Sequence, residues 1–266
     1  MIVAAGQFVP KAGDMAANSH IMSQQMANAA AVGASLIVFP ELCLTGYLTP
    51  EELLPLAVSP DSMEIAALRD TACRSGIDIA FGFSEKTDTG TVYNSMVYID
   101  QRGEIIATYH KVHLWDSEKQ WAKPGEGFAA FDTGEARCGM WICYDTRFPE
   151  AARLLAIDGA TLGLVATAWL GPAAEWELAL RARAMDNGMY VVGSALQGAH
   201  GPFVFNGSSL IVDPHGQVLA EAEEGAEAVI TAEYNEAVLR RFRERLPLLA
   251  HRRLDVYGAL LHPASW

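Results

Sequence analysis

The sequence is poor in cysteine, and this shortage narrows the possible folds. Its 266 residues include four cysteines, Cys43, Cys73, Cys138 and Cys143, which are too few and too dispersed for a disulfide-stapled fold. No Cys-x-x-Cys pair occurs, which argues against a zinc ribbon or a thioredoxin-type site. We therefore expect a cytoplasmic protein with reduced thiols.

Basic residues are also scarce. Lysine and arginine number 19 against 32 acidic residues, which gives a formal net charge of −13. Nucleic acids and anionic membranes attract positively charged surfaces, so neither is expected as a partner. This charge balance places no restriction on a small neutral substrate.

Long apolar runs are missing as well. The longest uncharged stretch, residues 15–40, is interrupted by polar side chains and lacks the roughly 18 consecutive apolar residues of a membrane helix. The first residues have no basic segment before their apolar run, so we interpret them as a strand and not as a signal peptide.

Apolar segments alternate with helical patterns along the whole chain, and 51% of the residues are hydrophobic. Strands are expected at 2–8, 36–39, 77–83, 91–99, 104–110, 138–144, 162–168, 189–196, 208–212 and 228–233. Helices are expected at 15–34, 63–74, 149–157, 173–187 and 235–244, followed by an irregular tail over 246–266. No linker divides the chain. The pattern predicts one α/β domain over 1–266, with two stacked mixed sheets and helices outside.

Several enzyme signatures are absent, among them GxSxG, HExxH, the phosphate-binding P-loop and a GxGxxG after a strand. His110 and His113 lie three residues apart at a strand end, where this spacing places them on opposite faces. We therefore expect no metal site there, and no cofactor.

Three reactive residues each follow a buried strand: Glu41, Lys111 and Cys143. Taken singly, each has an ordinary explanation, because acids often end strands at a solvated edge and cysteine often fills a core. Strand ends are also where layered α/β proteins gather functional groups. Together the three predict acyl transfer, since a carboxylate can deprotonate a thiol and an ammonium can stabilise an oxyanion.

The segments around these residues are FPELCLTGY (39–47), YHKVHLW (109–115) and CYDTRFPE (143–150). They resemble the nitrilase, or carbon–nitrogen hydrolase, superfamily. The resemblance implies a four-layer α-β-β-α sandwich that pairs into a homodimer or a higher homo-oligomer. It also implies Glu41 as general base, Lys111 as oxyanion stabiliser and Cys143 as nucleophile. The backbone N–H of Tyr144, on the turn after the nucleophile, can supply a second oxyanion donor.

Many members of this superfamily carry a further glutamate shortly after the lysine, where it orients the substrate amide or the lysine. Glu118 fits that position, and Glu126 in a glycine-rich loop is the competing candidate. The alternative for Glu118 is an exposed acid at the start of a helix.

The branch of the superfamily is indicated by the residues after the cysteine. Nitrilases usually have Trp-Glu there, whereas this chain has Tyr144-Asp145, which is nearer to amidases, ω-amidases and N-carbamoyl hydrolases. Four aromatic residues could wall a small pocket or simply pack in the core: Tyr47, Trp115, Tyr144 and Trp169. Arg147 is a candidate for binding an acidic acyl group or a purely structural residue.

The sequence thus predicts hydrolysis of a small aliphatic amide to a carboxylic acid and ammonia through a thioester. The alternatives are hydrolysis of an N-carbamoyl compound or of a dicarboxylic acid monoamide. A non-catalytic member that uses the fold as an interaction module is a third possibility.

Overall fold

Two six-stranded mixed sheets pack face to face in the computed structural model, which describes residues 1–262. The first sheet has the order β14 (Ala228–Glu233), β1 (Ile2–Gln7), β2 (Ala34–Val38), β3 (Asp78–Lys86), β4 (Val92–Ile99) and β5 (Ile105–His110). The second has the order β13 (Val218–Glu221), β12 (Leu210–Val212), β9 (Tyr190–Ala195), β8 (Leu162–Thr167), β7 (Arg137–Ile142) and β6 (Ala130–Asp132).

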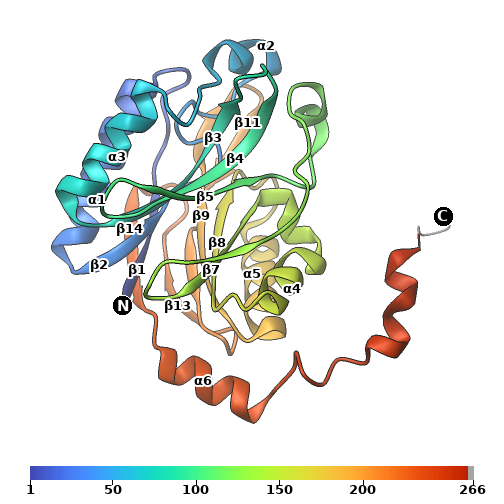
Figure 1. The fold of residues 1–266 in the computed structure, drawn as a ribbon. Coiled ribbons are helices and arrows are strands. Elements are labelled where there is room, and N and C mark those ends of the chain that lie inside the picture. Colours follow the sequence, from blue (N-terminus) through green and yellow to red (C-terminus); the bar gives the residue numbers. More distant parts are fainter. Residues whose placement is uncertain (263–266) are drawn as a thin grey trace.

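Helices cover the two outer faces of this sandwich. The first sheet is covered by α1 (Met15–Ala31) and α3 (Met63–Ser75), and the second by α4 (Pro149–Ile157) and α5 (Ala173–Asn187). Figure 1 shows the two helix pairs on opposite sides of the molecule. The four-layer α/β sandwich predicted from the sequence is confirmed.

Strand β2 shows how the sequence produces the layers. Leu36 and Val38 belong to the core between the sheets, whereas Ile37 packs in the core under α1 and α3. Successive side chains of a strand point to opposite faces, so a strand buried on both faces is apolar at every position. This explains why the central strands appear in the sequence as unbroken apolar runs.

The strand directions bring four connections to one side of the sandwich. β2 runs parallel to β1 and β3, and β5 has the same direction because β4 is antiparallel to both of its neighbours. In the second sheet β7, β8 and β9 are parallel. The carboxyl ends of β2 and β5 therefore share an edge of one sheet, and those of β7 and β8 share an edge of the other.

Some boundaries differ from the sequence prediction. The first helix ends at Ala31, not at Ala34, because Gly33 adopts a positive φ of 82° and turns the chain directly into β2. The strand expected to run to Tyr144 ends at Ile142.

Several short elements were missed. They are α2 (Pro50–Leu53), the 3₁₀ helix η1 (Leu54–Leu56), the strands β6 and β13, and the hairpin of β10 (Gln197–His200) and β11 (Phe203–Asn206). Each is four residues or shorter, too short for a hydrophobic period to show.

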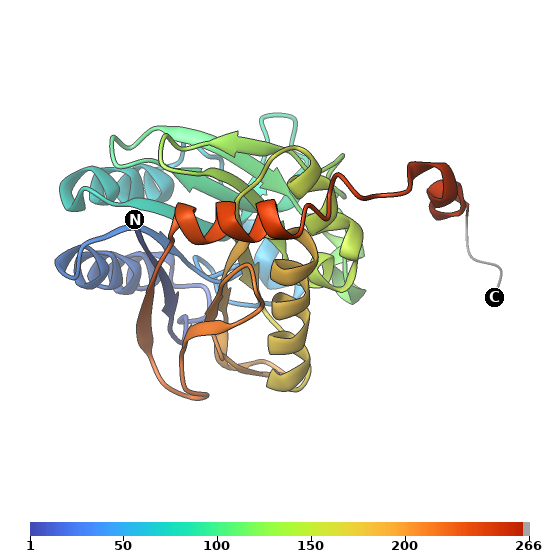
Figure 2. The same cartoon turned by 90° about the horizontal axis from the view of Figure 1, so that it is seen from below.

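The chain ends in an extended arm. After α6 (Glu236–Arg245) it leaves the sandwich and forms the 3₁₀ helix η4 (Leu254–Leu261), so the tail expected to be irregular is partly helical. Figure 2 shows this helix well away from the rest of the molecule. Residues 263–266 of the expected tail lie outside the described residues. Within residues 1–262, no helix is long and apolar enough to cross a membrane.

Candidate active site

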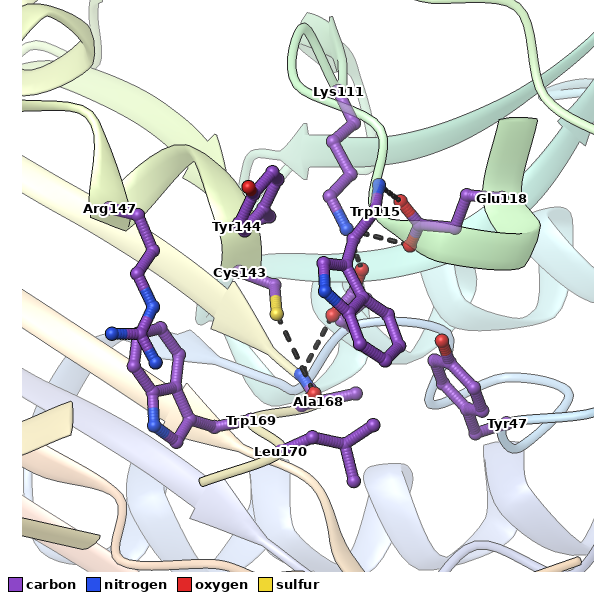
Figure 3. Close-up of a pocket in the computed structure, with 11 residues that line it drawn as sticks. Tyr47, Lys111, Trp115, Glu118, Cys143, Tyr144, Arg147, Ala168, Trp169 and Leu170 are labelled. Carbon is purple, nitrogen blue, oxygen red and sulfur yellow. Dashed lines mark hydrogen bonds and ion pairs between the residues drawn. The ribbon is translucent and has the colours of Figure 1, made fainter. Parts of the chain in front are cut away.

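The four connections after β2, β5, β7 and β8 meet around a small cavity of about 60 Å³. It is lined by Glu41, Tyr47, Lys111, Trp115, Glu118, Cys143, Tyr144, Arg147, Ala168, Trp169 and Leu170. Figure 3 shows the lysine, the cysteine and Glu118 approaching one another from different segments. Both sheets contribute to the lining, so neither builds the cavity alone.

Glu41 lies three residues after β2 and is completely buried. Its Oε1 atom accepts hydrogen bonds from Lys111 Nζ at 2.7 Å and from Asn94 Nδ2 at 2.8 Å. The backbone beside it packs against Gly82 of β3, where a Cβ atom would lie only 2.6 Å from the Glu41 Cα. Glycine is therefore required at position 82 for the carboxylate segment to reach this depth.

Lys111 directly follows β5 and is 1% exposed. Its ammonium donates to Glu41 Oε1 at 2.7 Å and to Glu118 Oε1 at 2.6 Å. Burial alone would lower the pKa of Lys111, but the carboxylates of Glu118 and Glu41 more than offset it and hold the pKa well above its ordinary value. The lysine is thus a fixed positive charge inside the cavity.

Glu118 lies in the 3₁₀ helix η2 (Asp116–Gln120) and is 2% exposed. Its Oε2 atom accepts the backbone N–H of Trp115 at 2.8 Å, which closes the turn that carries it. Burial raises the pKa of Glu118 to about 7; Lys111 opposes this shift and the charge of Glu41 adds to it. The competing candidate, Glu126, is exposed and does not line the cavity.

Two contributors to the site were not identified from the sequence. Asn94 of β4 is fully buried and its Nδ2 donates to both Glu41 and Glu118, at 2.8 and 3.0 Å. Ala168 follows β8, and its backbone N–H donates to Glu41 Oε2 at 2.7 Å. The signal for Asn94 was an amide within a largely apolar strand, whereas a backbone group such as that of Ala168 leaves no sequence signal.

Cys143 begins the 3₁₀ helix η3 (Cys143–Arg147) directly after β7, in a left-handed conformation with φ of 43°. Its thiol donates to the Ala168 carbonyl oxygen at 3.5 Å, so the cysteine and Glu41 contact the same residue. Burial, together with the charge of Glu41, raises the pKa of Cys143 above its ordinary value, and Lys111 opposes this shift. The thiol is therefore protonated until a base removes its proton.

The four aromatic candidates all line the cavity: Tyr47, Trp115, Tyr144 and Trp169. Tyr47 also packs against Phe205, with ring centroids 5.1 Å apart, so this residue both lines the cavity and belongs to a hydrophobic core cluster. Arg147 is at the cavity as well; its guanidinium carbon lies 4.4 Å from the centroid of the Trp169 ring.

The two histidines beside Lys111 contact different carboxylates. His110 Nε2 lies 2.9 Å from Glu85, and His113 Nδ1 lies 2.7 Å from Asp145. Among residues 1–262 no group of three or more His, Cys, Asp or Glu side chains is arranged to hold a metal ion.

The arrangement combines the groups that thiol-based acyl transfer needs. A buried carboxylate and a protonated thiol contact the same residue, and a fixed ammonium lies in the same cavity. A carboxylate can take the thiol proton as the thiolate attacks, and an ammonium can stabilise the oxyanion that results.

Comparison with known proteins gives a consistent result. The model of the family described as carbon–nitrogen hydrolase matches residues 2–244. A probable nitrilase of Schizosaccharomyces pombe is 34% identical, and the match covers 98% of both chains. An omega-amidase of Saccharomyces cerevisiae is also 34% identical, over 84% of this chain and 82% of its own.

A solved structure agrees with the computed one over nearly the whole chain. The NitN amidase from Nesterenkonia sp. AN1 matches with a TM-score of 0.87 and 28% identity, over 98% of this chain and 100% of its own. A Glu-to-Gln variant of that amidase carries the acetamide moiety of fluoroacetamide on its active-site cysteine.

Proposed function

The chain belongs to the carbon–nitrogen hydrolase family, and from this premise we propose that it hydrolyses small aliphatic amides to the carboxylic acid and ammonia. One observation carries the proposal: the buried cluster of Glu41, Lys111 and Glu118 lies in the same small cavity as the Cys143 thiol. The cavity volume of about 60 Å³ favours a short acyl chain. The similarity to a solved amidase supports the same reaction.

The first half-reaction forms a thioester. Glu41 removes the proton of the Cys143 thiol as the sulfur attacks the amide carbonyl carbon. The carbonyl oxygen becomes an oxyanion that Lys111 and the backbone N–H of Tyr144 stabilise. The C–N bond then breaks, and the nitrogen leaves as ammonia after it receives the proton held by Glu41.

The second half-reaction releases the acid. Glu41, again a carboxylate, takes a proton from water as the water oxygen attacks the thioester carbon. The C–S bond breaks, the proton returns to the Cys143 sulfur, and the carboxylic acid leaves. Glu118 and Asn94 hold the lysine and the base in place, and Glu118 orients the substrate amide.

The test is ammonia release by the purified protein from a panel of substrates: propionamide, butyramide, a dicarboxylic acid monoamide, an N-carbamoyl amino acid and propionitrile. Cys143→Ala, which removes one partly buried sulfur atom, should fold normally and release no ammonia. Cys73→Ala is the matched control, because Cys73 is exposed and far along the chain from the cavity residues. Ammonia release by Cys143→Ala at a tenth of the wild-type rate or more would refute the nucleophile.

A second substrate class, the dicarboxylic acid monoamides, is favoured by Arg147. Its guanidinium lines the cavity and stacks on Trp169, although Glu175 also contacts it at 2.7 Å. A carboxylate at the far end of a substrate could bind this cation, and one of the relatives is named an omega-amidase. Arg147→Gln should then reduce turnover of a monoamide such as succinamic acid far more than turnover of butyramide.

We further propose that the protein is a homodimer held in part by the C-terminal arm. Leu254, Val256 and Leu260 on this arm are 68%, 59% and 69% exposed, and the outer helices expose Leu178 at 68%. Exposed apolar side chains gathered on a projecting segment are typical of a surface that another chain covers. Light scattering on the full chain and on a variant ending at residue 245 tests this; a monomeric full chain would contradict it.

A further inference from the structure

Asp145, two residues after the cysteine, is a fully buried carboxylate with four hydrogen-bond partners. Its Oδ1 atom accepts the backbone N–H of His113 at 2.9 Å and faces His113 Nδ1 at 2.7 Å. Its Oδ2 atom accepts the hydroxyl of Tyr109 at 2.6 Å and the backbone N–H of Ile142 at 3.0 Å. Three of these four partners, the Tyr109 hydroxyl and the backbone N–H groups of His113 and Ile142, are donors to the carboxylate.

These contacts join the two segments that bring Lys111 and Cys143 to the cavity. One is the lysine segment, residues 109–113, and the other is the nucleophile turn, residues 142–148. Within residues 1–262, all three hydrogen bonds between the two segments end on the Asp145 carboxylate. The ring of His113 also stacks on Phe148, at 3.7 Å between centroids.

The same carboxylate closes the nucleophile turn on itself. The bond from the Ile142 N–H to the Asp145 side chain encloses Cys143 and Tyr144, and Cys143 holds a left-handed φ of 43°. A residue with a side chain adopts this conformation at a cost and keeps it only where its surroundings impose it. The Asp145 carboxylate is a contact of this kind, because it bonds the backbone just before Cys143 from within the turn.

We propose that Asp145 is a positioning residue, whose carboxylate fixes the lysine segment against the nucleophile turn and so sets the placement of Lys111 relative to the Cys143 thiol. The inference rests on the proposed amidase function for its turnover test. A displacement of about 1 Å between reacting groups can cost roughly 100-fold in rate, so loosening this connection should slow catalysis more than it destabilises the fold.

The chain offers a matched control in the first sheet, at the end of β3 that lies away from the cavity. Asp78, at the amino end of β3, accepts the hydroxyl of buried Tyr98 and the backbone N–H of Gln101. This is the same pairing of a carboxylate with a tyrosine and a peptide group, and Asp78 and Tyr98 do not line the cavity. Asp78→Asn and Tyr98→Phe therefore reproduce the loss of these hydrogen bonds without touching the site.

The experiment compares Asp145→Asn with Asp78→Asn in a Cys73→Ser background. This background removes the exposed thiol, and Cys43 and Cys138 are completely buried, so iodoacetamide reports on Cys143. We expect butyramide turnover to fall about 100-fold in Asp145→Asn and to stay within about threefold of wild type in Asp78→Asn. The pH profile of alkylation should shift to higher pH only in Asp145→Asn, because the thiolate loses the fixed charge of Lys111.

A second pair keeps the test decisive if Asp145→Asn does not fold. Tyr109→Phe removes a single hydroxyl from the connection, and Tyr98→Phe removes the equivalent hydroxyl at the control site. Asp145 is only structural if the two members of each pair lose the same amount of turnover and no variant shifts the pH profile of alkylation. If the wild type hydrolyses no amide, the proposed function fails on its own, and the alkylation profiles still decide the role of Asp145.

Discussion

The ammonium of Lys111 lies 2.6 Å from a carboxylate oxygen of Glu118, and the two side chains are 1% and 2% exposed. Glu41 lies on the same ammonium at 2.7 Å, so one buried cation serves two carboxylates. Burial and the charge of Glu41 together keep Cys143 a thiol in the absence of substrate, although Lys111 opposes them. In the proposed mechanism the Cys143 thiol must therefore lose its proton as it attacks the substrate. Each member of the cluster then has a distinct role that a substitution can test.

Glu41→Gln should be nearly inactive. Glutamine keeps the shape of the side chain but cannot accept the thiol proton. Loss of a general base costs about 10²- to 10⁴-fold, and the upper end applies here because the base is used in both half-reactions. Steady-state ammonia release measures the effect, with Glu126→Gln at an exposed position as the control. Normal turnover in Glu41→Gln would overturn the mechanism.

Lys111→Arg should lose activity by about 100-fold or more, which is the cost of removing one oxyanion donor. The guanidinium is planar and bulkier than the ammonium and cannot occupy the space between Glu41 and Glu118 in the same way. The exposed Lys86→Arg is the control. If Lys111→Arg keeps wild-type kcat on butyramide, Lys111 acts only as a long-range positive charge.

Glu118→Ala should separate thiol reactivity from amide turnover. The variant, made in the Cys73→Ser background, should fold, and its Cys143 should still react with iodoacetamide, because Glu41 and the thiol are untouched. Amide turnover should fall sharply, since Lys111 and the substrate carbonyl lose the near-attack geometry that Glu118 imposes. Glu126→Ala should leave both the alkylation rate and the amide turnover unchanged. Loss of amide turnover in Glu126→Ala, with normal turnover in Glu118→Ala, would transfer the role to Glu126.

Stability should depend on pH through Glu118. Its pKa is raised from 4.5 to about 7, so its contribution to stability is complete below pH 4.5 and is lost as the pH rises through 7. Relative to Glu118→Gln, the free energy of unfolding of the wild type should decrease across that window, by up to about 3 kcal/mol. Urea unfolding of both proteins from pH 4.5 to 8 tests this. A constant difference would mean that Glu118 has an ordinary pKa.

The sequence was sufficient to predict the layers and the residues at the strand ends. Glu41, Lys111 and Cys143 each follow an apolar run, and the parallel strand directions explain why such residues converge. It was insufficient for Asn94, because the pairing of β4 with its neighbours places that amide between two glutamates. The choice of Glu118 over Glu126 likewise depends on the turn that Glu118 closes with Trp115. A hydrogen bond from a backbone N–H, such as that of Trp115, leaves no pattern in the sequence.

The preference for amides over nitriles follows from the groups around the thiol. Both substrates can add the Cys143 thiolate. An amide gives a tetrahedral oxyanion that loses ammonia, whereas a nitrile gives a thioimidate whose nitrogen must be protonated before water can enter. Lys111 and the Tyr144 N–H are donors suited to the oxyanion, and Lys111 is held protonated by its two carboxylates.

Propionamide should therefore be hydrolysed to the free acid, and propionitrile should be a poor substrate or a slow inactivator. Asp145 stands where the nitrilases that the sequence resembles have glutamate, and its carboxylate contacts Tyr109, His113 and Ile142 and does not line the cavity. Ammonia release from equal concentrations of the two compounds measures the preference, and intact mass after mixing identifies any adduct on Cys143. A missing acyl adduct alone decides nothing, because deacylation can be faster than acylation. Nitrile turnover that equals or exceeds amide turnover would overturn the assignment to the amidase branch and would leave the fold and the Glu41–Lys111–Cys143 arrangement unaffected.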